Sequence, residues 1–475
     1  MMRRALALAV AAALFMTGCA SRADKDSAGR TTAAESSKPA DGGTSGGDAD
    51  QKFGSLDSPC GKGTAKVAAA EAGGSPDTLR IGIANDRNST FRPGLNSFFW
   101  DSANAFVKWC NDQGGVAGVP LEAVDVDGKV LEVEAAVAKS CSETFALVGG
   151  GWTQDNLAFS GKDGADFHKC KLIAFAGFAV SSDFAEANGQ VQPVPNTAHE
   201  KPDGWLLELA KLYPEGAKHL AVMYGTLPAI EMVADQVVGV AEATKKFGKV
   251  TKISYDALTP DFNLMATQVK DQKAGLVYYA GEEKNFAKFV QALDAADVDA
   301  VVFADANQYD AQVLEGIGAT DRDVLVRIAS HPYEEADEFP ATQKLVDVMK
   351  QYNPEGRVTS LTAQSFSAML LFAQSAKQCA EDSGEITREC VLAEGRKVTS
   401  WDGGGLHAEA NPGENKPPTC SMFVGIKNGK WVRKFPELDS DADDGDGFSC
   451  TGELQTLSGD FGEGKVDPSR DDTVG

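Results

Sequence analysis

The sequence predicts an α/β protein with two lobes, each built on a doubly wound parallel sheet. From about residue 78 onward, short apolar runs alternate with longer runs of helical periodicity. Runs rich in Val, Ile, Leu and Phe are typical of parallel strands buried on both faces. Strand–helix–strand repetition at this length produces right-handed βαβ units. The pattern breaks at the two prolines within Gln192–Asn196 and then starts afresh, which indicates a second lobe.

The elements of both lobes can be assigned in chain order. The apolar runs expected to form strands are Leu79–Ala84, Leu121–Val126, Phe145–Gly149, Leu172–Phe175, Leu220–Met223, Val250–Ser254, Gly275–Tyr279, Ala300–Phe303 and Val324–Ile328. The runs expected to form helices are Ser97–Asp112, Leu131–Cys141, Asn156–Lys169, Asp203–Leu212, Ala229–Phe247, Phe262–Lys270, Glu283–Ala295, Phe339–Tyr352 and Leu361–Cys379. A second break near His331-Pro332-Tyr333 indicates another crossing between the lobes. Because ligands of open α/β sheets bind beyond the carboxyl ends of the strands, we expect a ligand cleft between the lobes that hinge closure seals.

The C-terminal region departs from this alternation. Thr419–Ile426 and Lys430–Phe435 flank Asn428-Gly429, a dipeptide suited to the tight turn of a β-hairpin. The acidic stretch after Pro436 resembles a calcium loop, but a loop started at Asp439 lacks the glycine and the glutamate that an EF-hand needs at its sixth and twelfth positions. We therefore expect a solvated acidic tail and no metal.

The N-terminal sequence resembles a lipoprotein signal. Arg3 and Arg4 precede an apolar run, Ala5–Phe15, that is too short to span a membrane and fits a secretory signal. Met-Thr-Gly then precedes Cys19, and this order resembles a lipobox, which implies cleavage before Cys19 and a diacylglyceryl group on its sulfur. The alternative is an ordinary signal peptide with an incidental cysteine. Residues 1–18 are thus expected to be the signal peptide, and residues 19–76 the lipidated cysteine and a flexible linker.

Cysteine usage indicates an oxidising compartment. The chain has nine cysteines, so eight remain for disulfides if Cys19 carries lipid. The pairs that spacing favours are Cys379 with Cys390, Cys110 with Cys141, Cys420 with Cys450, and the remaining Cys60 with Cys170. A metal site is the alternative, but the sequence has neither C-x-x-C nor H-x3-H spacing.

Charge and motifs exclude several function classes. A net charge of −24 argues against nucleic acid, whose binding depends on Lys and Arg. It also argues against an acidic membrane surface as a partner of the folded body. Gly149-Gly150-Gly151 does not form a P-loop, and G-x-S-x-G, S-x-x-K and H-E-x-x-H are absent. The sequence therefore contains none of these catalytic motifs. The carboxylate pair that a glycosidase needs stays open, because the chain has many Asp and Glu residues and nothing indicates a particular pair.

Several short segments, in order along the chain, carry a family resemblance. They are R-I-G-I-A, N-A-F-V-K-W-C-N-D-Q-G-G-V-A-G-V-P-L-E-A-V, F-A-L-V-G-G-G-W-T, K-L-I-A-F-A-G-F-A-V-S-S-D-F, S-Y-D-A-L-T-P-D-F-N and W-D-G-G-G-L-H-A. With them, the region from Leu79 to Phe435 resembles the type I periplasmic binding proteins that serve branched-chain amino acid and amide importers.

The resemblance implies two lobes joined by three crossovers, no cofactor and no catalysis. The implied domains are lobe 1 at 77–196 and 333–397, lobe 2 at 197–332 and 398–436, and an acidic tail at 437–475 tied by a possible disulfide. Implied partners are a permease and an ATPase of an ABC importer, with the protein held outside the cell membrane by its lipid alone. We expect a monomer.

The family reads the α-carboxylate and α-ammonium groups of its ligand at strand ends, and this sequence departs from it there. Thr153 stands where a serine is usual, and Asn307 takes a position that is often acidic, with Asp305 a displaced candidate. Tyr278 and Tyr279 alternate faces of one strand, so at most one is expected in the cleft. The full set of candidate ligand-binding residues is Arg87, Trp152, Thr153, Phe178, Ala179, Ser181, Tyr224, Glu282, Asp305, Asn307 and Tyr309.

Several candidates have a simpler alternative role. Arg87, suited to a planar anion, could instead be a solvent-facing loop residue. Trp152 and Phe178, suited to stacking on a ligand, could instead pack within a lobe or hinge. The function expected from the whole is capture of a small polar solute, such as an amino acid, an amide or a related carboxylate, by closure of two lobes. A ligand sensor that signals to a membrane partner is the first alternative, and a lipid-anchored enzyme is the second.

Overall fold

The computed structural model describes residues 52–71, 73, 75–161 and 164–470. The expected signal peptide, Cys19 and most of the expected linker lie outside these residues. Within the described part of the chain, no helix combines the length and the apolar character that crossing a membrane would require.

The first lobe is built on a five-stranded parallel sheet in the order β3–β2–β4–β5–β6. These strands are β2 (Leu79–Asn85), β3 (Leu121–Asp127), β4 (Ala146–Val148), β5 (Ala174–Phe175) and β6 (Gln190–Val191). The chain moves outward from β2 to β3 and then returns past β2 to β4, so right-handed crossovers place successive helices on opposite faces. Accordingly, α1 (Ser97–Asp112) and α2 (Val133–Glu143) contribute to two different hydrophobic clusters.

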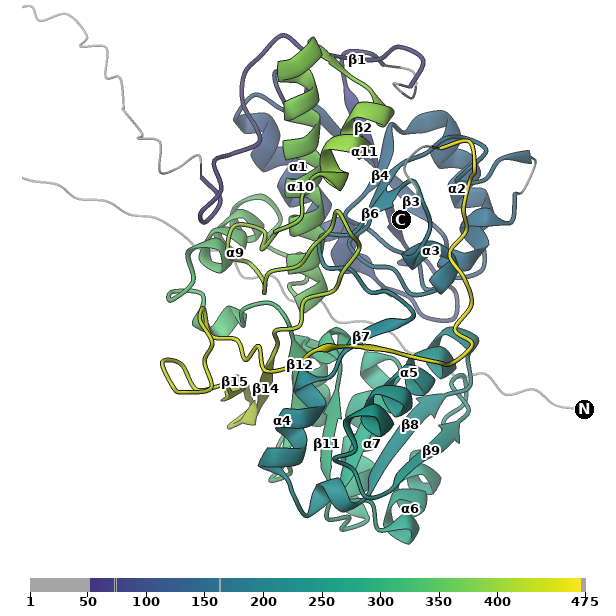
Figure 1. Cartoon of the computed structure of the whole chain (residues 1–475), viewed down its shortest axis with the longest axis vertical. Coiled ribbons are helices and arrows are strands. Elements are labelled where there is room, and N and C mark those ends of the chain that lie inside the picture. The colour runs from purple at the N-terminus through teal and green to yellow at the C-terminus, as the bar shows by residue number, and fades with distance from the viewer. Residues whose placement is uncertain (1–51, 72, 74, 162–163, 471–475) are drawn as a thin grey trace, which may run out of the picture. The chain divides into compact units, whose positions relative to one another are not determined.

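Helices from later in the chain complete the first lobe. α9 (Pro340–Tyr352), α10 (Ser360–Ser383) and α11 (Arg388–Arg396) share the hydrophobic cluster of α1. Figure 1 shows α10, in green, lying along α1 although more than 200 residues separate them. A small parallel pair, β1 (Lys66–Val67) with β13 (Glu385–Ile386), joins the N-terminal segment to this group.

The second lobe carries a seven-stranded sheet in the order β15–β14–β12–β11–β10–β8–β9. Its parallel strands are β8 (Leu220–Gly225), β9 (Val250–Tyr255), β10 (Leu276–Ala280), β11 (Val301–Ala304) and β12 (Val324–Ile328). The helices are α4 (Gly204–Leu212) and α5 (Pro228–Thr244) on one face, and α6 (Phe262–Gln272), α7 (Glu283–Ala295) and α8 (Ala311–Ile317) on the other. The two sheets and their interleaved helices confirm the predicted fold class.

A hairpin extends the second sheet beyond β12. β14 (Met422–Lys427) pairs antiparallel with β12 and with β15 (Lys430–Phe435). Asn428 and Gly429 both have positive φ, 53° and 69°, as a tight hairpin turn requires. The predicted hairpin is therefore confirmed. The chain passes between the lobes after β6, after β12 and after α11, which gives the three expected crossovers.

One predicted helix is wrong. In place of a helix over Asn156–Lys169, the chain forms a short 3-10 helix, η2 (Asp155–Phe159), and then an irregular segment. Gly161 and Gly164 have φ of 69° and 79°, values that an α-helix does not accommodate. A four-residue helix, α3 (Ser182–Ala185), follows β5 in this part of the lobe.

The disulfide pairing differs from the prediction in two of four bonds. Cys379–Cys390 and Cys420–Cys450 are paired as expected. Cys110 bonds Cys60 and Cys141 bonds Cys170, so the predicted Cys110–Cys141 and Cys60–Cys170 pairs are wrong. The reason is topological, because α1 carries Cys110 on one face of the sheet and α2 carries Cys141 on the other.

The C-terminal segment is bound to both lobes. Its strand β16 (Leu454–Thr456) pairs antiparallel with β7 (Glu200–Pro202), a strand of the first crossover. Figure 1 shows this yellow segment running past β7 toward the first lobe. There Asp467 pairs with Lys171, and its carbonyl accepts from Asn188 Nδ2 at 2.9 Å.

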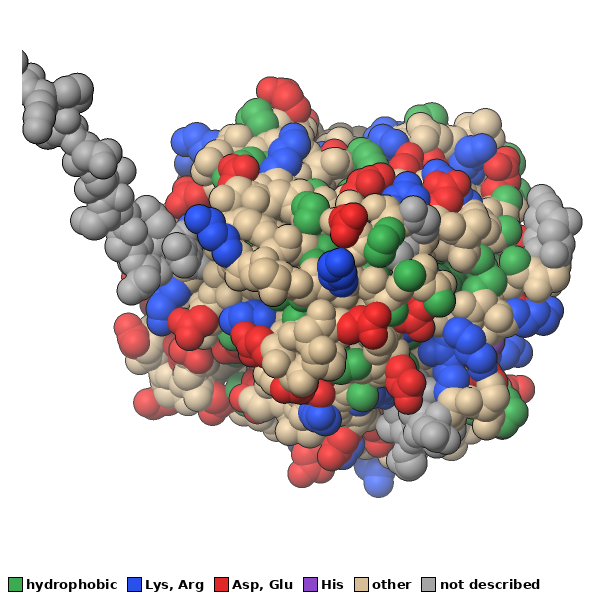
Figure 2. All heavy atoms as spheres, turned by 90° about the horizontal axis from the view of Figure 1, so that it is seen from above, with side chains coloured by type: hydrophobic (Ala, Val, Ile, Leu, Met, Phe, Trp, Pro, Cys, Tyr) green, Lys and Arg blue, Asp and Glu red, His purple; other side chains and the backbone are tan. Residues whose placement is uncertain are grey.

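The acidic loop that resembles a calcium site is organised by its own backbone. The Asp443 carboxylate accepts N–H groups of Asp439, Gly445 and Gly447 at 2.9 to 3.0 Å. Among the residues that the structure describes, no group of three or more acidic, His or Cys side chains is arranged to hold a metal. Over the surface, acidic and basic side chains are interspersed, as Figure 2 shows for one face.

Candidate functional site

A cavity of about 320 Å³ lies where the two lobes and the crossover segments meet. The first lobe contributes loop residues that follow β2, β4 and β5, and the second contributes the carboxyl ends of β10, β11 and β12. Val194 and Pro195 of the first crossover and Pro417 and Pro418 of the third close its sides. The cavity therefore occupies the place that strand direction predicts for a ligand.

The floor of the cavity in the second lobe holds a charged cluster. Tyr278 donates to Asp305 at 2.5 Å, and Arg327 lies 2.9 Å from the same carboxylate. The Arg327 guanidinium also covers the ring of Trp205, with 5.0 Å from Cζ to the ring centroid. Burial, together with the adjacent Asp305, raises the pKa of Tyr278 well above its ordinary value, so the phenol stays a donor. Asp305 is thus neutralised by groups of its own lobe.

Lys201, on β7 of the first crossover, adds a second cation to the cavity lining. Its Nζ donates to the neutral side chain of Asn196 at 2.7 Å. No ion pair of Lys201 is found within the part of the chain that the structure describes. Burial is the main cause that lowers the pKa of Lys201 to about 8; Arg327 lowers it further, while Asp305 and Glu186 act in the opposite direction.

In the first lobe, two buried aspartates accept hydrogen bonds from backbone N–H groups of the loops beside the cavity. Asp86 accepts the N–H of Thr153 and the N–H of Val130, both at 2.7 Å. Asp155 accepts the N–H groups of Val180 and Ser181 at 2.7 and 3.0 Å. Burial raises the pKa of Asp155 to about 6 and also raises the pKa of Asp86. These donors are therefore committed to the protein itself.

Helix α5 supplies a long apolar wall. Its residues that line the cavity recur with helical spacing, and they are Ala229, Ile230, Val233, Gln236, Val237 and Val240. From Ala229 to Val240 there are eleven steps along the helix, which correspond to about 16 Å at 1.5 Å per residue. The one polar member, Gln236, donates to the carbonyl of Ala198 at 3.0 Å, so its amide is turned to the crossover segment. The rest of the wall is hydrocarbon.

Ion pairs join the lobes beside the cavity. Arg92, in the loop between β2 and α1, donates to Glu282 at 2.5 Å and lies 3.6 Å from Glu283. Arg357, just before α10, pairs with Asp310 of the second lobe. Since each pair has one partner in each lobe, both pairs favour the arrangement in which the lobes meet.

Six of the predicted site residues line the cavity, and they are Thr153, Phe178, Ala179, Glu282, Asp305 and Asn307. The side chain of Asn307 donates to the carbonyl of Gly281 at 3.2 Å. Tyr278 and Tyr279 both contribute to the lining, where at most one was expected. Their side chains do lie on opposite faces of the sheet, in different hydrophobic clusters.

The other five predicted residues lie outside the lining. Trp152 is 1% exposed, and its indole N–H donates to the carbonyl of Val126 at 2.9 Å. Arg87 pairs with Asp125 at 2.5 Å and covers the Trp100 ring. Ser181 caps the N-terminus of α3 by accepting from the Phe184 N–H.

Two tyrosines complete this group. Tyr224 is covered by Lys252, whose Nζ lies 4.6 Å from the ring centroid. Tyr309 is buried, stacks on Tyr333 and donates to Glu334. Tyr224 is thus engaged within the second lobe, and Tyr309 contacts the segment that follows β12 at the second crossover.

Lys201, Trp205, Arg327 and the face of α5 line the cavity although none of them was predicted from the sequence. Arg327 lies inside a strand, where the apolar run masks it. Lys201 and Trp205 follow the proline-rich crossover, and the break in pattern there was the only available signal. The apolar stripe of α5 looks the same whether it packs on a core or lines a cavity.

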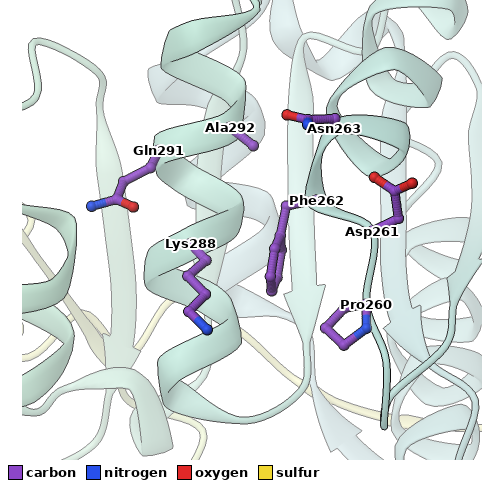
Figure 3. A pocket seen from close by; sticks show the side chains of 7 residues that line it. All are labelled: Pro260, Asp261, Phe262, Asn263, Lys288, Gln291 and Ala292. Carbon is purple, nitrogen blue, oxygen red and sulfur yellow. The ribbon is translucent and has the colours of Figure 1, made fainter. Parts of the chain in front are cut away.

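A second depression lies on the surface of the second lobe, between α6 and α7 (Figure 3). It measures about 570 Å³ and is lined by Pro260, Asp261, Phe262, Asn263, Lys288, Gln291 and Ala292. Figure 3 shows Phe262 and Lys288 side by side, and Lys288 Nζ lies 5.7 Å from the centroid of that ring. This groove belongs to one lobe alone, whereas the interlobe cavity gathers polar groups from both lobes and the crossovers.

Comparison with solved structures identifies the fold. The structure superposes on a fatty acid ABC transporter substrate-binding protein from Thermomonospora curvata with a TM-score of 0.63 and 16% identity, covering 76% of this chain and 92% of that one. A leucine-binding protein from Thermotoga maritima gives 0.60 and 16% identity over 75% and 98% of the two chains. A solute-binding protein from R. palustris in complex with 4-hydroxybenzoate gives 0.59 and 17% identity over 75% and 95%. At these identities the likeness establishes the fold alone.

The family follows from the sequence itself. No curated protein matches the chain. A family model described as periplasmic binding protein matches residues 78–430, which include the first sheet, the second sheet up to the start of β15, and all three crossovers. With two doubly wound lobes, three crossovers and a cavity between the lobes, the chain belongs to the periplasmic binding protein family and has its type I fold.

Proposed function

We propose that the protein is the solute-capturing subunit of an ABC-type importer. The observation that carries this proposal is the cavity itself, which takes its walls from both lobes and from the crossovers between them. A solute bound there touches both lobes, so its contacts favour closure, and closure removes it from water. The structural neighbours that are named as transporter binding proteins support the same role.

The proposed location is outside the cell membrane, with a lipidated Cys19 as the anchor. Met-Thr-Gly before Cys19 supports lipidation, and four disulfides in the described residues support an oxidising compartment. A permease and an ATPase are the proposed partners. The protein would act as a monomer that delivers one solute at a time.

The test of capture uses the whole chain carrying Cys19→Ala, so that no detergent is needed. After partial unfolding and refolding to remove a co-purified solute, a panel of amino acids, amides, aromatic acids, aliphatic acids and sugars is screened by thermal shift. A ligand at about 100 times its Kd stabilises the folded state by about 2.7 kcal/mol. We expect at least one solute to bind and to be recovered unchanged by mass spectrometry. Recovery of a converted product, or binding by no member of the panel, would refute capture.

The anchor is tested separately by cell fractionation. Wild-type protein is expected with the membranes and the Cys19→Ala form in the soluble fraction. A Cys19→Ala form that stays with the membranes would refute the lipid anchor and leave the capture proposal untouched.

A further inference from the structure

The cavity is apolar along most of its length. The α5 face from Ala229 to Val240 forms one wall, and prolines of two crossovers also line the cavity. A wall about 16 Å long that offers hydrocarbon contacts favours an extended apolar body, because burial of each CH₂ group from water is favourable. A small, highly polar solute would leave this wall without a partner.

The polar part of the cavity contains one cation, Lys201, that has no ion pair among the described residues. Lys201 and Arg327 are the cations among the described lining residues, and Asp305, Glu282 and Glu283 are the anions. Asp305 pairs with Arg327 at 2.9 Å, and Arg92 pairs with both glutamates. Lys201 is therefore left without an ion pair in the part of the chain that the structure describes, and its Nζ donates to the neutral side chain of Asn196. A partly buried ammonium of this kind is stabilised by a bound anion.

The groups that would read an amino acid are already engaged. For the α-carboxylate, the N–H groups of Thr153 and Val180 are donated to Asp86 and Asp155. For the α-ammonium, the carboxylates among the described lining residues are those of Glu282, Glu283 and Asp305. Arg92 pairs with both glutamates and Arg327 pairs with the aspartate. A zwitterion would have to displace these partners at both of its ends.

We propose that the solute is an apolar monocarboxylate without an α-ammonium group, with its carboxylate at Lys201 and its hydrocarbon body along α5. This inference rests on the proposed function and goes beyond it by naming the chemical class of the solute. Lys201 is then the residue that distinguishes an acid from its uncharged analogue, and Val233 is part of the wall that contacts the hydrocarbon chain.

The first experiment compares three probes on the refolded Cys19→Ala protein by titration calorimetry: decanoate, 1-decanol and leucine. We expect decanoate to bind at least tenfold more tightly than 1-decanol, because only the acid meets the charge of Lys201, and we expect no binding of leucine. Shortening the acid should weaken binding about fourfold for each CH₂ group removed along the wall. Binding of leucine in preference to decanoate would overturn the inference while leaving capture intact.

Variants then locate the two ends of the ligand. Lys201→Met should weaken decanoate at least tenfold and leave 1-decanol unchanged, whereas Lys218→Met, at an exposed ion pair elsewhere in the second lobe, should change neither. Val233→Asn should weaken decanoate more than hexanoate. If Lys201→Met keeps its melting temperature and binds decanoate like the parent, the proposed carboxylate position is wrong. If no solute of the wider panel binds either, the proposed function itself fails.

Discussion

Arg92 is predicted to act as a latch between the lobes. Its guanidinium donates to Glu282 at 2.5 Å and lies 3.6 Å from Glu283, so Arg92→Gln removes an ion pair that exists only while the lobes meet. The side chains of Arg92, Glu282 and Glu283 are 23%, 27% and 12% exposed, which places the pair between a solvated and a buried one.

The expected magnitude follows from this partial burial. Exposed ion pairs contribute roughly 0.2 to 1 kcal/mol, and hydrogen bonds to charged groups roughly 1.5 to 3 kcal/mol. An intermediate loss of about 1 to 2 kcal/mol acts on the closed arrangement alone. Because the solute binds most tightly when the lobes are closed, its Kd should rise about 5- to 30-fold.

Titration of the highest-affinity solute into wild-type protein and Arg92→Gln measures this effect directly. The matched control is Arg322→Gln, which removes an Arg–Asp294 pair of 2.8 Å within the second lobe. The control should lower the melting temperature without changing Kd. An unchanged Kd for Arg92→Gln, or an equal change in both variants, would refute the latch.

Three further predictions follow from the fold and the cavity. Replacing Cys60 and Cys110 together by Ala should lower the free energy of unfolding by about 4 kcal/mol, and replacing Cys379 and Cys390 should lower it by about 3 kcal/mol. The reason is that the first disulfide joins residues 50 positions apart and the second joins residues 11 apart, and a longer closed loop restricts the unfolded chain more. Guanidinium unfolding that ranks the two variants in the opposite order would contradict this. Trp152→Ala should lower the free energy of unfolding by about 3 to 5 kcal/mol, since it removes a fully buried ring. It should change the Kd for decanoate far less than Lys201→Met does. A larger effect on Kd than that of Lys201→Met would place Trp152 in contact with the ligand. Decanoate affinity should be constant well below pH 8 and fall by up to tenfold per pH unit above it. Burial lowers the pKa of Lys201 to about 8, so Lys201 of the free protein loses its proton there, whereas a bound carboxylate favours the protonated form. A decanoate affinity of Lys201→Met that falls with pH in the same way would contradict this assignment.

Elements with strong periodicity could be predicted from the sequence alone. Helices α1 and α7 have the predicted bounds, Ser97–Asp112 and Glu283–Ala295, because their apolar faces recur over several turns. The helix predicted at Asn156–Lys169 failed because two glycines with positive φ interrupt a segment whose composition is otherwise compatible with a helix. The two wrong disulfide pairs were predicted from spacing along the chain. Spacing carries no information on which face of a sheet a helix covers, so it could not show that Cys110 and Cys141 lie on opposite faces.

The candidate site was predictable where it depends on strand direction. Asp305 and Asn307 follow a parallel strand, and both line the cavity. Arg327 was not predictable, because a single cation inside an apolar strand gives no indication of the side to which it points. Lys201 was not predictable either, since its position depends on how the first crossover folds back between the lobes.

Strand-end position also selected residues with structural roles. Trp152 and Tyr309 follow strands just as Asp305 does, yet their rings are buried and their polar atoms are engaged within the protein. The difference arises from tertiary packing, which decides whether a loop side chain turns into the cleft or back into its own lobe.

A crystal structure of the refolded protein at saturating decanoate would test the central claim most directly. We expect one molecule in the interlobe cavity, with its carboxylate at hydrogen-bonding distance from Lys201 Nζ and its chain along Val233 and Val237. Decanoate found in the groove between α6 and α7, with none in the interlobe cavity, would contradict the proposed binding site.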